Sequence, residues 1–142
     1  LLLTLKLLTV LALLLKKEQH DIFLTIDCLD NVDPQKVEHM MSKLDLVFIS
    51  CTEDEIENYR YLGGEKLLIF LLGNKGSVAL INDCEITQEA LPVSNIIDTT
   101  GCGDAYQAAF CCKWYESMDI NAALLAGAKA GKKALSVLGG AF

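Results

Sequence analysis

The sequence has few of the basic residues that nucleic acid binding requires. Arg60 is its only arginine, and 19 acidic residues against 12 Lys and Arg give a formal net charge of −7. A nucleic acid partner needs clustered cations to neutralise its phosphates. The composition therefore argues against such a partner, and the acidity is an ordinary source of solubility.

Closely spaced metal ligands are also missing. None of the six cysteines forms a C-x-x-C pair with another, and His20 and His39 are the only histidines. Zinc sites usually combine such pairs with histidine. Several of the cysteines lie in apolar runs, where a free thiol behaves as a small hydrophobic group. We therefore expect reduced, structural thiols in a cytoplasmic protein.

The apolar start of the chain is too short to cross a membrane. Residues 7–15 lie between Lys6 and Lys16 and number nine, whereas a transmembrane helix needs roughly 20. No small-residue cleavage site follows, so a signal peptide is not favoured either. We expect a buried helix over residues 1–17 and no membrane partner. The chain starts without methionine and within an apolar, helix-like pattern. We interpret it as a piece of a longer protein.

Two common nucleotide-binding motifs are absent. The sequence contains no G-x-x-x-x-G-K-[ST] loop, which excludes the P-loop class. It also lacks a Rossmann G-x-G-x-x-G, because Gly101-Cys102-Gly103 is followed by Asp, Ala and Tyr. A nucleotide site, if there is one, must therefore be built in another way.

Strand and helix patterns alternate along the chain, and this alternation predicts a single α/β domain over residues 1–142 with a mostly parallel sheet. Turns at residues 73–76 and 82–83 should add antiparallel strands at one edge. We expect strands at residues 22–27, 44–50, 67–72, 77–81 and 85–87, and helices at 33–43, 52–62, 104–117 and 120–138.

The most informative stretch is Asp98-Thr99-Thr100-Gly101-Cys102-Gly103-Asp104. Two glycines at the mouth of a helix let the backbone come close to a bulky anion, and the N–H groups of the first helical turn favour negative charge. A carboxylate at the first helical position could then take a proton from an attacking hydroxyl. The plain alternative is a glycine-rich loop in which Asp104 only caps a helix.

This run resembles the D-T-x-G-A-G-D signature of the PfkB/ribokinase family of sugar kinases, with Cys102 where alanine is usual. The turn at residues 72–77, the Ala/Gly-rich helix at 122–134 and the ending at 139–141 are similar to that family too. The resemblance implies a ribokinase-like three-layer α/β/α fold. It also implies that the chain is the C-terminal, nucleotide-binding portion, without the N-terminal lid and sugar-binding part.

The resemblance assigns roles to individual positions and implies ATP, Mg²⁺ and K⁺ as cofactors. Asp104 matches the catalytic base, and the backbone of Gly101, Cys102 and Gly103 matches the anion hole. Asp98 and Thr100 match a monovalent-cation site. Positions that match the ATP site are Gly73, Gly76, Thr99 and Gly139.

Thr52-Glu53-Asp54-Glu55 lies where the family carries an N-x-x-E magnesium motif. Thr stands in place of Asn, so the match is partial. Thr52 and Glu55 also form the pattern of a capping box, in which both side chains bond to backbone N–H groups. A water-mediated magnesium role for Glu55 and the capping role are both open, and they are compatible.

The expected reaction is phosphoryl transfer from ATP to a hydroxyl of a sugar or sugar derivative. Residues 27–30, the strand at 44–50 and the ending at 139–142 look most like the fructoselysine (fructosamine) 6-kinase branch, while an adenosine or ribose kinase branch stays open. The rival hypothesis is a non-catalytic nucleotide-binding or regulatory module derived from the same fold. Activity of this chain alone and formation of a homodimer are left open.

The last predicted helix has small residues on one face. Ala123, Gly127, Ala130, Gly131 and Ala134 recur at spacings near three and four. Such a face lets another element approach closely, so we expect tight packing here.

Overall fold

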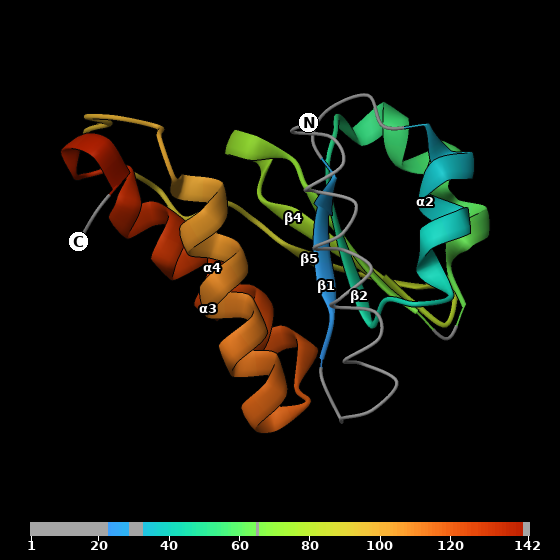
Figure 1. Cartoon of the computed structure of the whole chain (residues 1–142). Helices are drawn as coiled ribbons and strands as arrows, with labels where there is room; N and C mark the ends of the chain where they lie inside the picture. The colour runs from blue at the N-terminus through green and yellow to red at the C-terminus, as the bar shows by residue number, and fades with distance from the viewer. Residues whose placement is uncertain (1–22, 29–32, 65, 141–142) are drawn as a thin grey trace, which may run out of the picture.

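One five-stranded sheet, in the order β1-β2-β3-β4-β5, organises the part of the chain that the structure describes (Figure 1). The computed structural model describes residues 23–28, 33–64 and 66–140, so the helix expected over residues 1–17 lies outside the described residues. The strands are β1 (Thr25–Cys28), β2 (Leu46–Ser50), β3 (Leu67–Leu71), β4 (Ser77–Ile81) and β5 (Cys84–Gln88).

The sheet is mixed. The antiparallel strands expected at one edge are confirmed, and only the expectation of a mostly parallel sheet is corrected. β1, β2 and β3 run parallel, whereas β4 is antiparallel to β3 and to β5. Parallel neighbours need a crossover connection, and the links into β4 and β5 are tight turns. At the second turn Asn82 and Asp83 have positive φ (49° and 60°), as a two-residue hairpin requires. The two short links therefore impose the antiparallel pairs.

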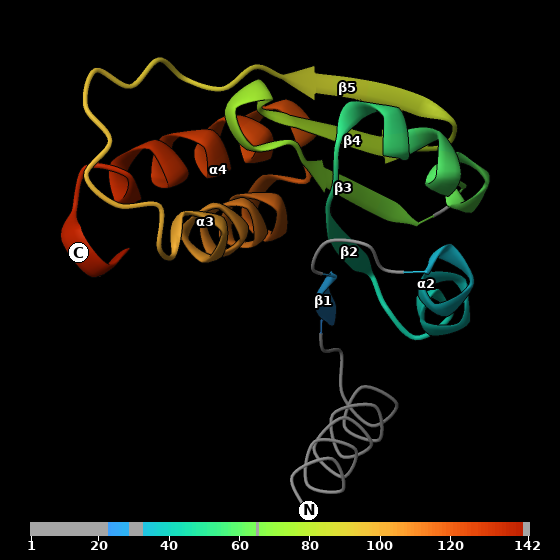
Figure 2. The ribbon, with the colours of Figure 1, turned by 90° about the horizontal axis from the view of Figure 1, so that it is seen from above.

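Helices cover both faces of the sheet and give three layers (Figure 2). On one face α2 (Pro34–Met41) and the 3₁₀ helix η1 (Glu53–Leu62) pack with strand residues such as Val47 and Ile49. On the other face α3 (Cys102–Ser117) and α4 (Ile120–Ala134) pack with Leu46 and Phe48. Alternate residues of one strand thus serve two cores, which is why β2 is apolar and buried from Leu46 to Ile49.

Several helix boundaries differ from those expected, and α2 covers Pro34–Met41 rather than residues 33–43. α3 begins at Cys102 rather than at Asp104, because Gly101 adopts the left-handed conformation (φ 75°) and turns the chain into the helix at once. α4 ends at Ala134, and a separate 3₁₀ turn, η3 (Leu138–Gly140), follows it. No helix within the three described ranges is long and apolar enough to cross a membrane.

α4 packs closely on α3 through its small residues, as expected. A Cβ added at Gly127 would lie 2.8 Å from the ring of Tyr106, and one at Gly131 would lie 3.4 Å from the Cys102 carbonyl oxygen. Ala123 and Ala134 on the same face are fully buried. The small-residue face therefore fixes how α4 supports the beginning of α3.

Candidate active site

The start of α3 is a helix N-terminus with a glycine at its N-cap. Gly101 is the N-cap and has no side chain to cap the helix, and its carbonyl accepts from the Ala105 N–H (2.9 Å). In any helix the first N–H groups lack intrahelical acceptors. A Cβ added at Gly103 would meet nothing within 4 Å. The first turn thus has free space beside Gly103, and anion binding there stays a prediction.

Asp104 lies at the third position of α3, which corrects the expectation that it is the first helical residue. Its side chain is exposed. Among the residues that the structure describes, its carboxylate has no hydrogen-bond or ion-pair partner. Because the fold does not occupy this carboxylate, it is available to accept a proton beside the open turn.

The loop that leads into α3 is held by Asp98. Its Oδ1 accepts from the Thr100 N–H (2.9 Å) and Oγ1 (2.8 Å), and its Oδ2 accepts from the N–H of Gly139 (2.9 Å). Hydrogen bonds from the backbone of Thr100 and then of Gly139 lower the pKa of Asp98. Thr99 contributes its carbonyl oxygen, which accepts from the Cys102 N–H (3.3 Å).

The structure therefore brings together three of the predicted site residues. Thr100 is a near neighbour of Asp98 in sequence, whereas Gly139 follows Asp98 by 41 residues. The negative charge of an ionised Asp98 is suitable for a neighbouring cation. Both of its oxygens already accept hydrogen bonds, so the monovalent-cation role stays a prediction.

The turn between β3 and β4 contains the short 3₁₀ turn η2 (Gly73–Lys75). Gly73 and Gly76 have φ of 61° and 98°. A Cβ at Gly76 would come 2.1 Å from the Gln88 carbonyl oxygen, whereas one at Gly73 would meet nothing within 4 Å. The structure thus gives Gly76 a packing role in the hairpin, and ATP contact by either glycine stays a prediction.

Thr52 and Glu55 form the expected capping box at the start of η1. Oε2 of Glu55 accepts from the Thr52 N–H (2.7 Å) and from Thr52 Oγ1 (2.9 Å). The backbone hydrogen bond from Thr52 is the main reason that the pKa of Glu55 is lowered. The capping role is confirmed, and a water-mediated magnesium role stays a prediction. No group of three or more His, Cys, Asp or Glu that could hold a metal is found within residues 23–28, 33–64 and 66–140.

An ion pair joins this turn to the glycine turn. Lys75 contacts the carboxylate of Glu53, and both side chains are largely exposed. Surface pairs of this kind stabilise a fold only weakly. The contact nonetheless shows that the ends of β2 and β3 bring these two predicted nucleotide-side segments together.

Sequence reasoning missed one buried pair next to the site. The hydroxyls of Ser77 on β4 and Tyr106 on α3 share a hydrogen bond of 2.7 Å. Burial raises the pKa of Tyr106 to about 12. Two features of the sequence could have suggested this pair. One is a serine at the start of an apolar strand, and the other is a tyrosine two positions after Asp104 in the predicted helix.

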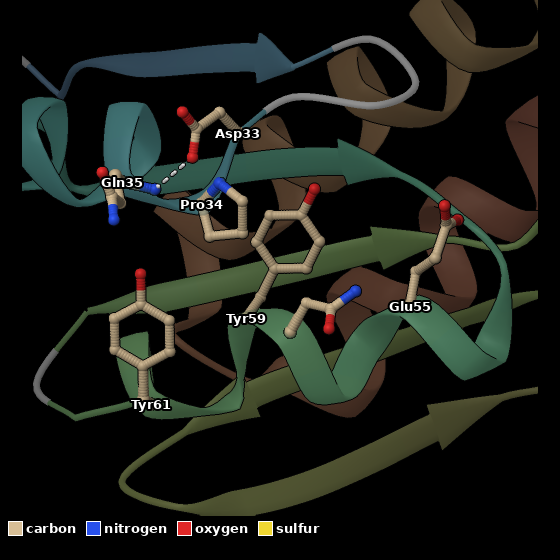
Figure 3. A pocket seen from close by; sticks show the side chains of 7 residues that line it. Asp33, Pro34, Gln35, Glu55, Tyr59 and Tyr61 are labelled. Atoms are coloured by element: carbon tan, nitrogen blue, oxygen red, sulfur yellow. Dashed lines mark hydrogen bonds between the residues drawn. The ribbon is translucent and has the colours of Figure 1, made fainter.

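A pocket of about 510 Å³ lies on the opposite face of the sheet, between α2 and η1 (Figure 3). Of the predicted site residues only Glu55 lines it, and the Gln35 N–H in this pocket donates to Oδ1 of Asp33 (3.0 Å). The start of α3 does not contribute to the pocket. Its lining residues are Asp33, Pro34, Gln35, Glu55, Asn58, Tyr59 and Tyr61.

Two curated relatives are similar to parts of the chain. A nucleoside kinase from Methanocaldococcus jannaschii is 35% identical over 68 residues, which are 48% of this chain and 22% of that protein. A ribokinase from Arabidopsis thaliana is 34% identical over 77 residues, which are 54% of this chain and 20% of that protein.

Solved structures show that the fold is ribokinase-like. The Arabidopsis ribokinase, solved with ribose and ATP, matches with a TM-score of 0.69 at 21% identity and covers 84% of this chain and 43% of its own. A microbiome-derived acarbose kinase matches with a TM-score of 0.74 at 21% identity and covers 92% of this chain and 47% of its own. The chain thus spans less than half the length of each of these proteins.

The family model of pfkB family carbohydrate kinases matches residues 5–142, almost the whole chain. This match covers the loop from Asp98 to Asp104 and the turn from Gly73 to Gly76, the two segments that the sequence singled out. The chain belongs to the pfkB family of carbohydrate kinases.

Proposed function

We propose that the protein transfers the γ-phosphoryl group of ATP to a hydroxyl of a sugar or sugar derivative, with Asp104 as the general base. The strongest support for this proposal is the structure of the first turn of α3. This turn is open at Gly103 and carries a carboxylate that the fold does not use. A helix start of this kind favours a phosphoryl group, and the carboxylate lies on the same turn.

Asp104 removes the proton of the attacking hydroxyl, while the N–H groups at Gly101, Cys102 and Gly103 stabilise charge on the phosphoryl oxygens. For this the Cys102 N–H exchanges the Thr99 carbonyl oxygen for a phosphoryl oxygen. Such preorganised donors act where charge develops in the transition state. Asp104 must therefore be ionised before the reaction and protonated after the hydroxyl attacks.

The cofactors proposed are ATP with Mg²⁺, and K⁺ beside the anion hole. Mg²⁺ neutralises phosphate charge when it is bound with ATP. Glu55 keeps an ionised carboxylate in the first turn of η1, which fits a role through water in holding that ion. Asp98 and Thr100 would take part in the K⁺ site, and Gly73, Gly76, Thr99 and Gly139 would border the nucleotide.

The substrate proposed is a small sugar-containing molecule. The relatives are described as a nucleoside kinase, a ribokinase and an acarbose kinase. Fructoselysine stays in the proposal as the narrower prediction. An assay panel of ribose, adenosine, fructoselysine and acarbose therefore tests the branches that the sequence and these relatives suggest.

The test is an Asp104→Asn variant of the longest natural polypeptide that carries this chain. We expect the rate of ADP formation, measured with the sugar that the unmodified protein accepts, to fall by about 10²- to 10⁴-fold. This is the usual contribution of a general base. The Kd for Mg·ATP should change little, because the two residues have nearly the same shape. Unchanged turnover would exclude Asp104 as the base.

A second candidate is the non-catalytic nucleotide-binding module. It is favoured by Thr52 in place of asparagine. In that case Mg·ATP binds to the unmodified protein, no sugar on the panel releases ADP, and Asp104→Asn changes neither result.

A further inference from the structure

Ser77 and Tyr106 form a buried polar contact between β4 and α3. Ser77 is 1% exposed and is the only polar residue in the buried core of the described part of the chain. Its hydroxyl lies 2.7 Å from the hydroxyl of Tyr106, which is 9% exposed. A buried hydroxyl loses its contacts with water, so each of these groups needs the other.

The Tyr106 ring is fixed by its surroundings. It stacks on Phe110 of the same helix with ring centres 6.3 Å apart. On α4, Gly127 leaves room for it, since an added Cβ there would lie 2.8 Å from the ring. With the ring confined in this way, the hydroxyl has little freedom to find another partner. The hydrogen bond therefore sets the position of α3 relative to β4.

The contact lies between the two glycine segments. Ser77 follows Gly76 directly, and Tyr106 follows Asp104 by two residues on the first turns of α3. A change in the position of Tyr106 must move the turn that carries Asp104, because a helix transmits a shift along its axis as a rigid element. The pair thus connects the turn after β3 with the anion-binding start of α3.

We propose that Ser77 and Tyr106 are positioning residues, which hold the first turn of α3 in register with the β3–β4 turn so that both segments meet one nucleotide. This inference rests on the proposed function. It goes further, because it gives a role in nucleotide binding to two residues that are buried between β4 and α3.

A purely structural role and a positioning role predict different results for single and double variants. Tyr106→Phe and Ser77→Ala each leave a buried hydroxyl without a partner, which lowers stability. The double variant removes both hydroxyls and should recover most of that stability. A positioning role predicts that nucleotide affinity does not recover with it, because the directional contact is still missing. Tyr115→Phe on the exposed side of α3 is the matched control.

Two measurements on the full chain separate the possibilities. Calorimetric titration gives the Kd for Mg·ATP, and we expect it to rise about threefold or more in both single variants and in the double variant. Amide hydrogen exchange without ligand reports the first turns of α3 directly. Exchange there should be faster in all three variants, and Tyr115→Phe should match the unmodified chain in both measurements.

Two outcomes would overturn the positioning role. One is that the double variant has the same Kd for Mg·ATP and the same amide hydrogen exchange as the unmodified chain. The other is that the single variants lose thermal stability while amide exchange at the start of α3 stays unchanged. If the unmodified chain does not bind Mg·ATP at all, the proposed function fails. The exchange measurement then still decides whether the pair holds α3 in place.

Discussion

The β3–β4 turn and the first turn of α3 each contain a glycine, but the structure requires glycine at only one of the two positions. At Gly76 the chain has φ of 98°, and an added Cβ would come 2.1 Å from the Gln88 carbonyl oxygen. At Gly103 the backbone is helical, and an added Cβ would meet nothing within 4 Å. Folding needs the first glycine and does not need the second. The open position at Gly103 has no packing reason for glycine, and it supports the proposed phosphate site at the start of α3.

The segments around these glycines are also held differently. The β3–β4 turn closes on itself, since the Leu72 N–H donates to the Gly76 carbonyl (2.9 Å) and the Gly76 N–H donates to that of Gly73 (3.1 Å). The loop before α3 depends instead on distant parts of the chain, through the contact of Asp98 with Gly139. Changes near Gly139 should therefore disturb the loop before α3 and leave the β3–β4 turn intact.

The largest effect on stability is expected for Gly76→Ala. Its Cβ would overlap the backbone of the strand partner in a strained conformation, and we expect a loss of about 3 kcal/mol or more in the free energy of unfolding. Gly73→Ala is the matched control with free space, and positive φ alone should reduce stability by about 1 kcal/mol. Urea denaturation measures both. Equal losses would show that the close approach at Gly76 does not matter.

A smaller effect is expected from Tyr106 at alkaline pH. Its pKa is raised from 10.0 to about 12 in the folded protein, so the folded state keeps the proton that the unfolded state releases. The contribution is fully present below the unfolded pKa and is lost as pH rises towards the folded value. From about pH 9 to about pH 11 the unmodified chain should lose about 1 kcal/mol more than Tyr106→Phe. Parallel pH curves of urea denaturation would contradict the raised pKa.

The smallest effect is expected for Asp98→Asn. The pKa of Asp98 is lowered by its backbone hydrogen bonds, so its contribution is present above its ordinary pKa and is lost as pH falls through the lowered value. The side chain is at the surface, and global stability should therefore change little. Proteolysis of the loop before α3 should become faster in the variant, and faster in the unmodified chain at low pH. Glu55→Gln serves as the control, because it disturbs only its own turn at Thr52.

Sequence predicted the fold best where one local cause decides the structure. Apolar runs gave β2, β3 and β4 nearly to the residue, and Thr52 with Glu55 gave the start of η1. The short link at residues 73–76 predicted antiparallel strands at one edge, and the structure has them there. Only the balance differs, because two of the strand pairs are parallel and two are antiparallel, so the sheet is mixed rather than mostly parallel.

The candidate site was predictable as a motif and less so as a geometry. The D-T-T-G-C-G-D run located the loop and Asp104, but the left-handed conformation of Gly101 moved the helix start by two residues. The Ser77–Tyr106 contact could not be derived, because it depends on how α3 docks on β4 across 29 residues of sequence. Contacts of this kind follow from tertiary packing rather than from any local pattern.

The most direct test of the account is a calorimetric titration with Mg·ATP of the unmodified chain and of Gly103→Ala, with and without K⁺. Alanine has the higher helix propensity, so the variant should be as stable as the unmodified chain or more stable by up to about 1 kcal/mol. We predict micromolar-to-millimolar binding by the unmodified chain, strengthened by K⁺, and affinity at least about tenfold weaker in the variant, because the methyl group occupies the space of the anion. Equal affinity in two equally stable proteins would contradict the assignment of the α3 start as the phosphate site.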